Sequence, residues 1–213
     1  MSRSTLPIAI AMTTAAVVVL TACGSGSSPK PSDKIAGADS GSPSASSPTA
    51  LKGAPEIKLP SDVKVEIEDP TSKDATTSTA IADLKYAILA LRDGFAQGNG
   101  QADSMVHAYA MDAGIYWAKR IQKIKAEDKT ITGTYRYYDL DVSLNGKDTA
   151  AAHYCEDQRQ AFSKDIKTGK VFRTTPSNND FYRFTVFLTK NASGTWQVAR
   201  ESWTQGDKSC IRA

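Results

Sequence analysis

The sequence predicts an α+β domain in which helices pack on a curved antiparallel sheet. Two observations lead to this class. Apolar residues between positions 78 and 125 recur every three or four residues, which indicates amphipathic helices. From residue 131 onwards apolar and polar residues alternate, and turn sequences interrupt the alternation, which indicates a series of hairpins. Helices followed by a run of hairpins are typical of α+β proteins.

The first 22 residues have the layout of a secretory signal peptide. Arg3 gives a positively charged start, and an uncharged, largely apolar stretch runs from Pro7 to Leu20. That stretch is shorter than the roughly 20 residues that a transmembrane helix needs. It ends in Leu20-Thr21-Ala22-Cys23, which resembles the lipobox that bacterial lipoprotein enzymes process. We therefore expect removal of residues 1–22 and lipidation of Cys23. The alternative is an ordinary signal peptide that ends near a cysteine by chance.

Residues 23–56 are expected to carry the lipid and to act as a disordered linker. The stretch is rich in Ser, Pro and Gly and nearly free of aromatic and branched apolar side chains. Such a stretch cannot bury enough surface to offset its chain entropy. A diacylglycerol group anchors a protein stably, so we expect the extracytoplasmic face of the cell membrane as its location. Residues 57–213 then form the single folded domain.

The helical part of this domain follows a short extended segment, Val63–Ile67, which Pro70 ends. Ser78 or Thr79 is expected to cap a first helix, with Asp83 in its first turn, and Gly98 is expected to end it. A second helix is expected from about residue 101 to 125, with a bend or break near Gly114. The residues expected on its buried face are Val106, Tyr109, Ala110, Ala113, Tyr116, Trp117, Ile121 and Ile124.

Five strands are expected downstream of the helices, each bounded by turn sequences. Asn145-Gly146-Lys147 is one of these turns. The run Phe181–Leu188 is the strongest strand signal, because it is rich in aromatic and β-branched residues. The expected strands cover residues 131–142, 149–162, 169–174, 180–190 and 195–204.

Three cysteines are present, and Cys23 is assigned to the lipid. The other two, Cys155 and Cys210, are expected to pair as a disulfide, because thiols outside the membrane usually do. The two cysteines are 55 positions apart in the chain. In the chain-entropy treatment, closing a loop of this length stabilises a fold by up to roughly 4 kcal/mol. A metal or redox pair is the alternative, although the sequence has no C-x-x-C motif.

Several short motifs occur in a characteristic order. They are the lipobox and linker, Gly133-Thr134, Ala152-His153-Tyr154-Cys155-Glu156-Asp157, Thr168-Gly169, and Gly194-Thr195-Trp196-Gln197-Val198 before Cys210. This order resembles a group of actinobacterial NTF2-like lipoproteins with the SnoaL-like cone fold. The resemblance implies a cone-shaped sheet closed on one side by helices, often with a pocket, and a homodimer formed through the sheet. It implies no single activity, because this fold carries enzymes, carriers and interaction domains.

The resemblance also indicates where a catalytic site would lie. Enzymes of the ketosteroid isomerase and SnoaL-like kind place an Asp or His base inside the cone, with a Tyr or a second acid nearby. The candidates are His153 or Asp139 as base, Tyr137 as hydrogen-bond donor, and Asp141 and Asp157 as further acids. The competing interpretation places the aspartates on the solvated side of their strand, with Tyr138, Leu140 and Val142 facing the core, and makes His153 structural.

No cofactor or metal site is expected. The only two histidines, His107 and His153, are far apart, and His107 is expected to face solvent. No nucleophile-elbow, zinc-protease or phosphate-loop motif occurs. Glu156 and Asp157 are neighbours on a strand and should point to opposite faces, which makes them a poor carboxylate pair. The net charge is near +2 once Arg3 is removed, so no nucleic-acid partner is expected.

Positive charges gather towards the end of the second predicted helix. They belong to Lys119, Arg120, Lys123, Lys125 and Lys129. This cluster would suit anionic lipid head groups or wall polymers near the tether. The alternative is a solvated helix face with cations suited to a helix C-terminus.

Three functions are compatible with these observations. The first is a membrane-anchored lipoprotein whose domain binds a protein, a cell-wall component or a small apolar ligand without catalysis. The second is a ketosteroid isomerase-like or SnoaL-like enzyme acting on a small apolar substrate. The third is a structural or assembly-accessory lipoprotein without a ligand. The sequence favours a non-enzyme, because none of its motifs defines a catalytic site.

Overall fold

A computed structural model describes residues 51, 53–70 and 75–212 of the chain. The predicted signal peptide, Cys23 and most of the predicted linker lie outside the described residues. The described residues belong to one compact unit that spans Ser44–Ala213. No helix in these described ranges has the length and hydropathy needed to cross a bilayer.

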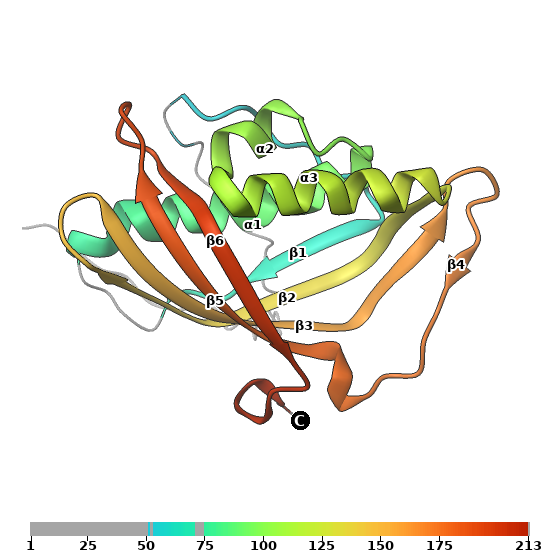
Figure 1. Cartoon of the computed structure of the whole chain (residues 1–213). Coiled ribbons are helices and arrows are strands. Elements are labelled where there is room, and N and C mark those ends of the chain that lie inside the picture. Colours follow the sequence, from blue (N-terminus) through green and yellow to red (C-terminus); the bar gives the residue numbers. More distant parts are fainter. Residues whose placement is uncertain (1–50, 52, 71–74, 213) are drawn as a thin grey trace, which may run out of the picture. The chain divides into compact units, whose positions relative to one another are not determined.

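The sheet of this unit has six strands (Figure 1). They are β1 (Val63–Ile67), β2 (Lys129–Leu144), β3 (Thr149–Asp165), β4 (Val171–Phe172), β5 (Phe181–Lys190) and β6 (Trp196–Gln205). Their order is β1-β2-β3-β5-β6, with β4 paired to β3. The five strands predicted after the helices are present, although the predicted strand at 169–174 is reduced to two residues.

The predicted antiparallel sheet is wrong in one respect, because β1 pairs with β2 in parallel. The Val63–Ile67 segment is therefore an edge strand of a mixed sheet. The helices lie between β1 and β2 in the chain, and such a crossover connection is what parallel neighbours require. The α+β class is otherwise confirmed, since all the remaining strand pairs are antiparallel.

The described residues form three α-helices, which lie on one side of the curved sheet (Figure 1). They are α1 (Ser78–Gln97), α2 (Asp103–Ala108) and α3 (Met111–Ala126). Gly98 ends α1 in the left-handed conformation, as predicted, with φ of 62°. The start of α1 differs from the prediction, because Thr77 takes the N-cap position after a short 3₁₀ turn. The Asp83 carboxylate accepts a hydrogen bond from the backbone N–H of Trp196 at 2.8 Å, so it ties α1 to β6.

The predicted break in the second helix occurs before Gly114, at Tyr109 and Ala110. The N–H of Ala110 donates to the carbonyl of Val198 in β6 at 2.9 Å, and Tyr109 forms a bridge with the same residue. The chain leaves the helix to make this contact and re-enters it at Met111, whose φ is 49°. The apolar periodicity is therefore not continuous across the break. Val106 and Tyr116, predicted to be buried, are 56% and 44% exposed.

Bulges in two strands change which residues face the helices. In β2, Tyr135 and Tyr137 belong to the main core, but beyond the irregularity between Tyr138 and Asp141 the core residues are Leu140 and Val142. An extra residue in a strand moves all later side chains to the opposite face. Simple alternation along the strand would put Tyr137, Asp139 and Asp141 on one face, but the bulge prevents this, so the three candidate site residues do not share a face.

The outer face of the sheet carries a second, smaller core. Cys155 and Cys210 form the predicted disulfide, which pins the C-terminal segment against this face. Tyr138 and Phe181 pack around it, and the Tyr138 hydroxyl donates to the carbonyl of Cys210. Tyr138 thus faces away from the main core, contrary to the interpretation that grouped it with Leu140 and Val142.

Gly133 provides a test of the pairing between β2 and β3. Its φ is 96°, and a Cβ at this position would overlap the carbonyl oxygen of Gln160. We expect Gly133→Ala to lower the free energy of unfolding by about 3 kcal/mol, since backbone strain and a steric clash add.

Gly146→Ala is the matched control, because Gly146 has a φ of 103° but open space around the added Cβ. This variant should lower the free energy of unfolding, measured by urea titration, by only about 1 kcal/mol. Equal losses in the two variants would contradict the close strand approach described here.

Candidate functional site

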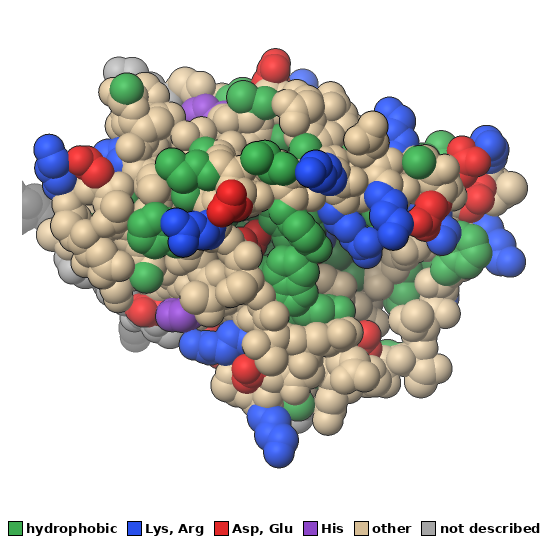
Figure 2. All heavy atoms as spheres, in the orientation of Figure 1, with side chains coloured by type: hydrophobic (Ala, Val, Ile, Leu, Met, Phe, Trp, Pro, Cys, Tyr) green, Lys and Arg blue, Asp and Glu red, His purple; other side chains and the backbone are tan. Residues whose placement is uncertain are grey.

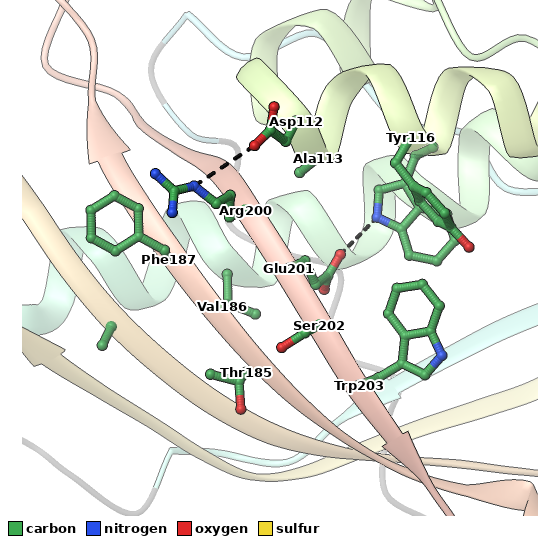
Figure 3. Close-up of a pocket in the computed structure, with 12 residues that line it drawn as sticks. Asp112, Ala113, Tyr116, Thr185, Val186, Phe187, Arg200, Glu201, Ser202 and Trp203 are labelled. Carbon is green, nitrogen blue, oxygen red and sulfur yellow. Dashed lines mark hydrogen bonds and ion pairs between the residues drawn. The ribbon is translucent and has the colours of Figure 1, made fainter.

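A cavity of about 790 Å³ lies where α3 runs beside the edge of β6 (Figure 3). Its lining residues come from α3, β3, β5 and β6. They are Asp112, Ala113, Tyr116, Trp117, Ala151, Thr185, Val186, Phe187, Arg200, Glu201, Ser202 and Trp203. Several lie on opposite faces of the sheet, so the cavity passes round the edge of β6.

A bulge in β6 decides which of its side chains face the helices. Arg200 pairs with Phe187 and Val198 with Leu188, which leaves Ala199 as the extra residue. Trp196 and Val198 face the main core before the bulge. Glu201 and Trp203 take the inner side after it, towards α3, while Arg200 and Ser202 take the outer side (Figure 3).

The inner part of the cavity, which we call the aromatic pocket, has mainly apolar walls. It consists of Ala113, Tyr116, Trp117, Val186, Glu201 and Trp203. The Trp117 and Trp203 rings stack with centroids 5.5 Å apart, and the Tyr116 ring lies 5.4 Å from that of Trp203. Trp203 is 38% exposed, whereas Trp117 is 8% exposed and forms the deeper wall. Figure 2 shows hydrophobic side chains gathered in a hollow on this side of the molecule.

Glu201 is the one carboxylate in the aromatic pocket. Its two oxygens accept hydrogen bonds from Trp117 Nε1 at 2.7 Å and from the Tyr154 hydroxyl at 2.6 Å. Burial raises the pKa of this carboxyl group above its ordinary value, although both hydrogen bonds oppose the rise. Glu201 therefore fixes the Trp117 ring and offers a polar point in an apolar wall.

The outer part of the cavity is polar at its rim. Arg200 forms an ion pair with Asp112 at 3.8 Å across the gap between β6 and α3. The Arg200 guanidinium also lies 5.8 Å from the centroid of the Phe187 ring. Both members of the ion pair are well exposed, so the pair contributes little to stability.

A buried polar cluster lies behind the aromatic pocket. Arg92 of α1 donates to Glu156 Oε1 at 2.8 Å and to the Tyr137 hydroxyl at 2.6 Å. Burial opposes the charge on Arg92, but the Glu156 carboxylate, Tyr137 and Tyr135 together outweigh it and raise the pKa of the guanidinium. The Tyr137 ring contacts that of Tyr154, which in turn bonds Glu201. This cluster is closed to solvent and therefore supports the pocket rather than forming part of it.

The structure does not bring the predicted catalytic residues together. His153 lies on the outer face of the sheet, with its Nδ1 3.2 Å from the Thr185 hydroxyl. Asp139 pairs with Arg212 at 2.7 Å in the C-terminal segment. Tyr137 is buried in the core against Arg92. None of the three lines the cavity.

The further predicted acids are also placed outside the cavity. Asp157 is buried and pairs with Arg159 at 3.0 Å, and Asp141 pairs in register with His153. Glu156 and Asp157 do point to opposite faces, as predicted, and each has its own arginine. Among the described residues, no group of three His, Cys, Asp or Glu side chains could hold a metal ion.

His107 is half-buried rather than solvent-facing, because its ring packs edge-on against Tyr86 with centroids 5.2 Å apart. The predicted basic cluster is present on α3. Lys119, Arg120, Lys123 and Lys125 are exposed. Lys129 differs from them, because it pairs with Glu127 at 3.2 Å.

Sequence reasoning missed Arg92 and Glu201. Arg92 could have been found, since it falls four residues after Ile88 and three before Phe95, on the apolar stripe of α1. A cation on a buried stripe indicates a buried partner. Glu201 gives no such signal, because simple alternation from Trp196 puts it on the outer face, and only the bulge at Ala199 turns it inward.

No protein-family model matches the chain, and no curated protein matches it. Among solved structures, a ketosteroid isomerase-like protein from Erwinia carotovora atroseptica is 19% identical at a TM-score of 0.39, over 59% of this chain and 95% of that one. The intermembrane space region of the chloroplast protein ARC6 is 16% identical at 0.39, over 63% and 98%.

A protein from Catenulispora acidiphila is 7% identical at a TM-score of 0.42, over 62% of this chain and 95% of that one. These TM-scores lie below 0.5, so the similarities carry no argument about activity. The α+β class rests instead on the strand order and helix packing of the chain itself.

The raised pKa of Glu201 predicts a pH dependence of stability. The folded protein retains this proton to higher pH than the unfolded chain, whose carboxyl titrates near the ordinary value of 4.5. The stabilisation that comes from this retained proton is complete at pH values below the ordinary pKa of 4.5. It is lost as the pH rises through the raised pKa of Glu201 in the folded protein. We expect Glu201→Gln to flatten this loss in urea unfolding measured from about pH 4 to about pH 8.

Glu127→Gln serves as the control, because Glu127 is exposed and lies away from the pocket. Its stability curve should keep the pH dependence of the parent chain. A Glu201→Gln curve that also keeps that dependence would show that Glu201 is not desolvated.

Proposed function

We propose that this domain binds a small apolar ligand in the aromatic pocket, without catalysis, while a lipid on Cys23 tethers the chain to the outer face of the membrane. The observation that carries the proposal is the aromatic pocket itself: Tyr116, Trp117 and Trp203 surround a recess with a single carboxylate. The whole cavity, of which the aromatic pocket is the inner part, has a volume of about 790 Å³, within the range of about 300–1,000 Å³ typical of small-molecule sites.

The exposed apolar surface supports a ligand at this place. Among the described residues, seven large apolar side chains are exposed, and four of them belong to α3 or β6: Tyr116 and Trp203, which line the cavity, and Met111 and Ile115. Clustered apolar surface of this kind marks a binding site more often than chance exposure does. Burying apolar surface under a ligand contributes a favourable free energy of about 25 cal/mol per Å².

Binding is favoured over the predicted isomerase chemistry because His153 and Asp139 lie outside the cavity. A second candidate function follows from Glu201, whose raised pKa in an apolar recess would suit a general base. In that case an apolar carbonyl substrate would lose a proton to Glu201. Glu201→Gln would then abolish turnover while leaving ligand affinity nearly unchanged.

Trp203→Ala tests the ligand site. We expect it to weaken binding of the neutral apolar dye Nile red at least about tenfold, because the exposed wall of the pocket is lost. The measurement is a fluorescence titration of a soluble chain that begins at Gly24, which contains the whole compact unit.

Phe172→Ala is the matched control, because Phe172 is an aromatic of similar exposure, 40% against 38%, on β4 outside the cavity. It should leave Nile red affinity unchanged. Absence of saturable Nile red binding by the parent chain would favour the third function, an accessory lipoprotein without a ligand.

Cys23→Ser tests the tether. In a bacterial host with lipoprotein processing, the parent chain should incorporate radiolabelled palmitate and fractionate with membranes. The variant should lose the label and leave the membrane fraction, because one thiol is the proposed attachment site for all the lipid. Membrane association of an unlabelled variant would contradict the proposal.

A further inference from the structure

We propose that the ligand of the aromatic pocket is an amphiphile, whose apolar chain lies in the pocket and whose anionic head group lies against Arg120 and Lys123 of α3. The inference rests on the proposed function and adds the chemical class of the ligand. The evidence for the head group is the pair of exposed cations beside the pocket, because binding of a purely apolar ligand would not need them.

The cations lie on the flank of α3 that borders the pocket. Arg120 follows Tyr116 by four residues and Lys123 follows it by seven, so all three share one side of the helix. Asp112, which precedes Tyr116 by four residues, lines the cavity from the same side. The pocket wall therefore continues along α3 into a basic surface. Figure 2 shows Lys and Arg side chains bordering the hydrophobic hollow.

These cations are available for a ligand. Arg120 and Lys123 are exposed, and neither forms an ion pair among the described residues. The other end of the rim is different, because Asp112 is already paired with Arg200. At the rim of the aromatic pocket, the charges without an ion-pair partner are therefore the positive charges of Arg120 and Lys123. They lie on the side towards the C-terminus of α3.

Glu201 fixes the direction of the ligand. Glu201 is half-buried and both of its carboxylate oxygens already accept hydrogen bonds from the protein, so an anionic head group beside it would face repulsion at this largely apolar wall. The stacked Trp117 and Trp203 rings offer an apolar surface to a hydrocarbon chain instead. The chain therefore enters the pocket and the head group stays at the basic rim, which water reaches.

The test compares three probes that share one tail: dodecyl phosphate, dodecanol and dodecyltrimethylammonium, each below its critical micelle concentration. Isothermal titration calorimetry of the soluble chain from Gly24 at low salt should give dodecyl phosphate about tenfold tighter binding than dodecanol, since two exposed charge pairs act together. Dodecyltrimethylammonium should bind no more tightly than dodecanol. Added salt should narrow the difference.

The variant that removes both charges, Arg120→Gln with Lys123→Gln, should bring dodecyl phosphate to the affinity of dodecanol and leave dodecanol unchanged. The matched control is Lys125→Gln with Lys208→Gln, which removes two exposed cations away from this flank. It should leave the tenfold difference intact.

The outcomes separate the two proposals. Equal binding of all three probes, tightest binding of the ammonium probe, or an unchanged phosphate preference in the Arg120 and Lys123 variant would overturn the head-group assignment and leave the apolar pocket standing. Failure of dodecanol to bind would overturn both.

Discussion

The hydrogen bond from the Ala110 N–H to the Val198 carbonyl organises the region that we assign to ligand binding. This hydrogen bond interrupts the helix between α2 and α3. It also pairs the chain with the first half of the free edge of β6, at Val198. The chain then re-enters a helix at Met111 and runs beside the second half of that edge. Without this contact, α3 would continue the phase of α2, and Tyr116 and Trp117 would not lie opposite Trp203.

The bulge at Ala199 completes the arrangement from the other side. One extra residue in β6 turns Glu201 and Trp203 towards α3, immediately beyond the point where the helix break is bound. Glu201 then accepts a hydrogen bond from Trp117 at 2.7 Å, which links β6 to α3 directly. Two local irregularities, one in a helix and one in a strand, therefore cooperate to create a recess at an otherwise unprotected sheet edge.

The buried polar cluster behind the pocket holds the surrounding helix and strands in fixed positions. Removing one partner of a buried ion pair costs about 3–5 kcal/mol, so the Arg92–Glu156 contact strongly disfavours structures that separate α1 from β3. Tyr137 and Tyr154 connect the cluster to Glu201. The polar groups in this part of the core thus fix the relative positions of α1, β2, β3 and β6.

Much of the architecture could be predicted from the sequence, and the limits have physical causes. The hairpin run, the end of α1 at Gly98 and the Cys155–Cys210 pairing follow from local chemistry, namely alternation, a left-handed glycine and two remaining thiols. The bulges in β2 and β6 have no comparable local signal, because they are set by pairing with neighbouring strands. They move Asp139 away from the core and bring Glu201 into the pocket, so the site was the part least accessible to prediction.

The three tryptophans allow the central claim, an apolar ligand between α3 and β6, to be tested in one experiment. Trp117 and Trp203 line the pocket, whereas Trp196 is buried in the core and bonds Thr79. In a ¹H–¹⁵N spectrum of the soluble chain, addition of dodecanol should shift the indole resonances of Trp117 and Trp203 and leave that of Trp196 in place. Saturable shifts confined to Trp196, or no shift at any of the three, would contradict the account.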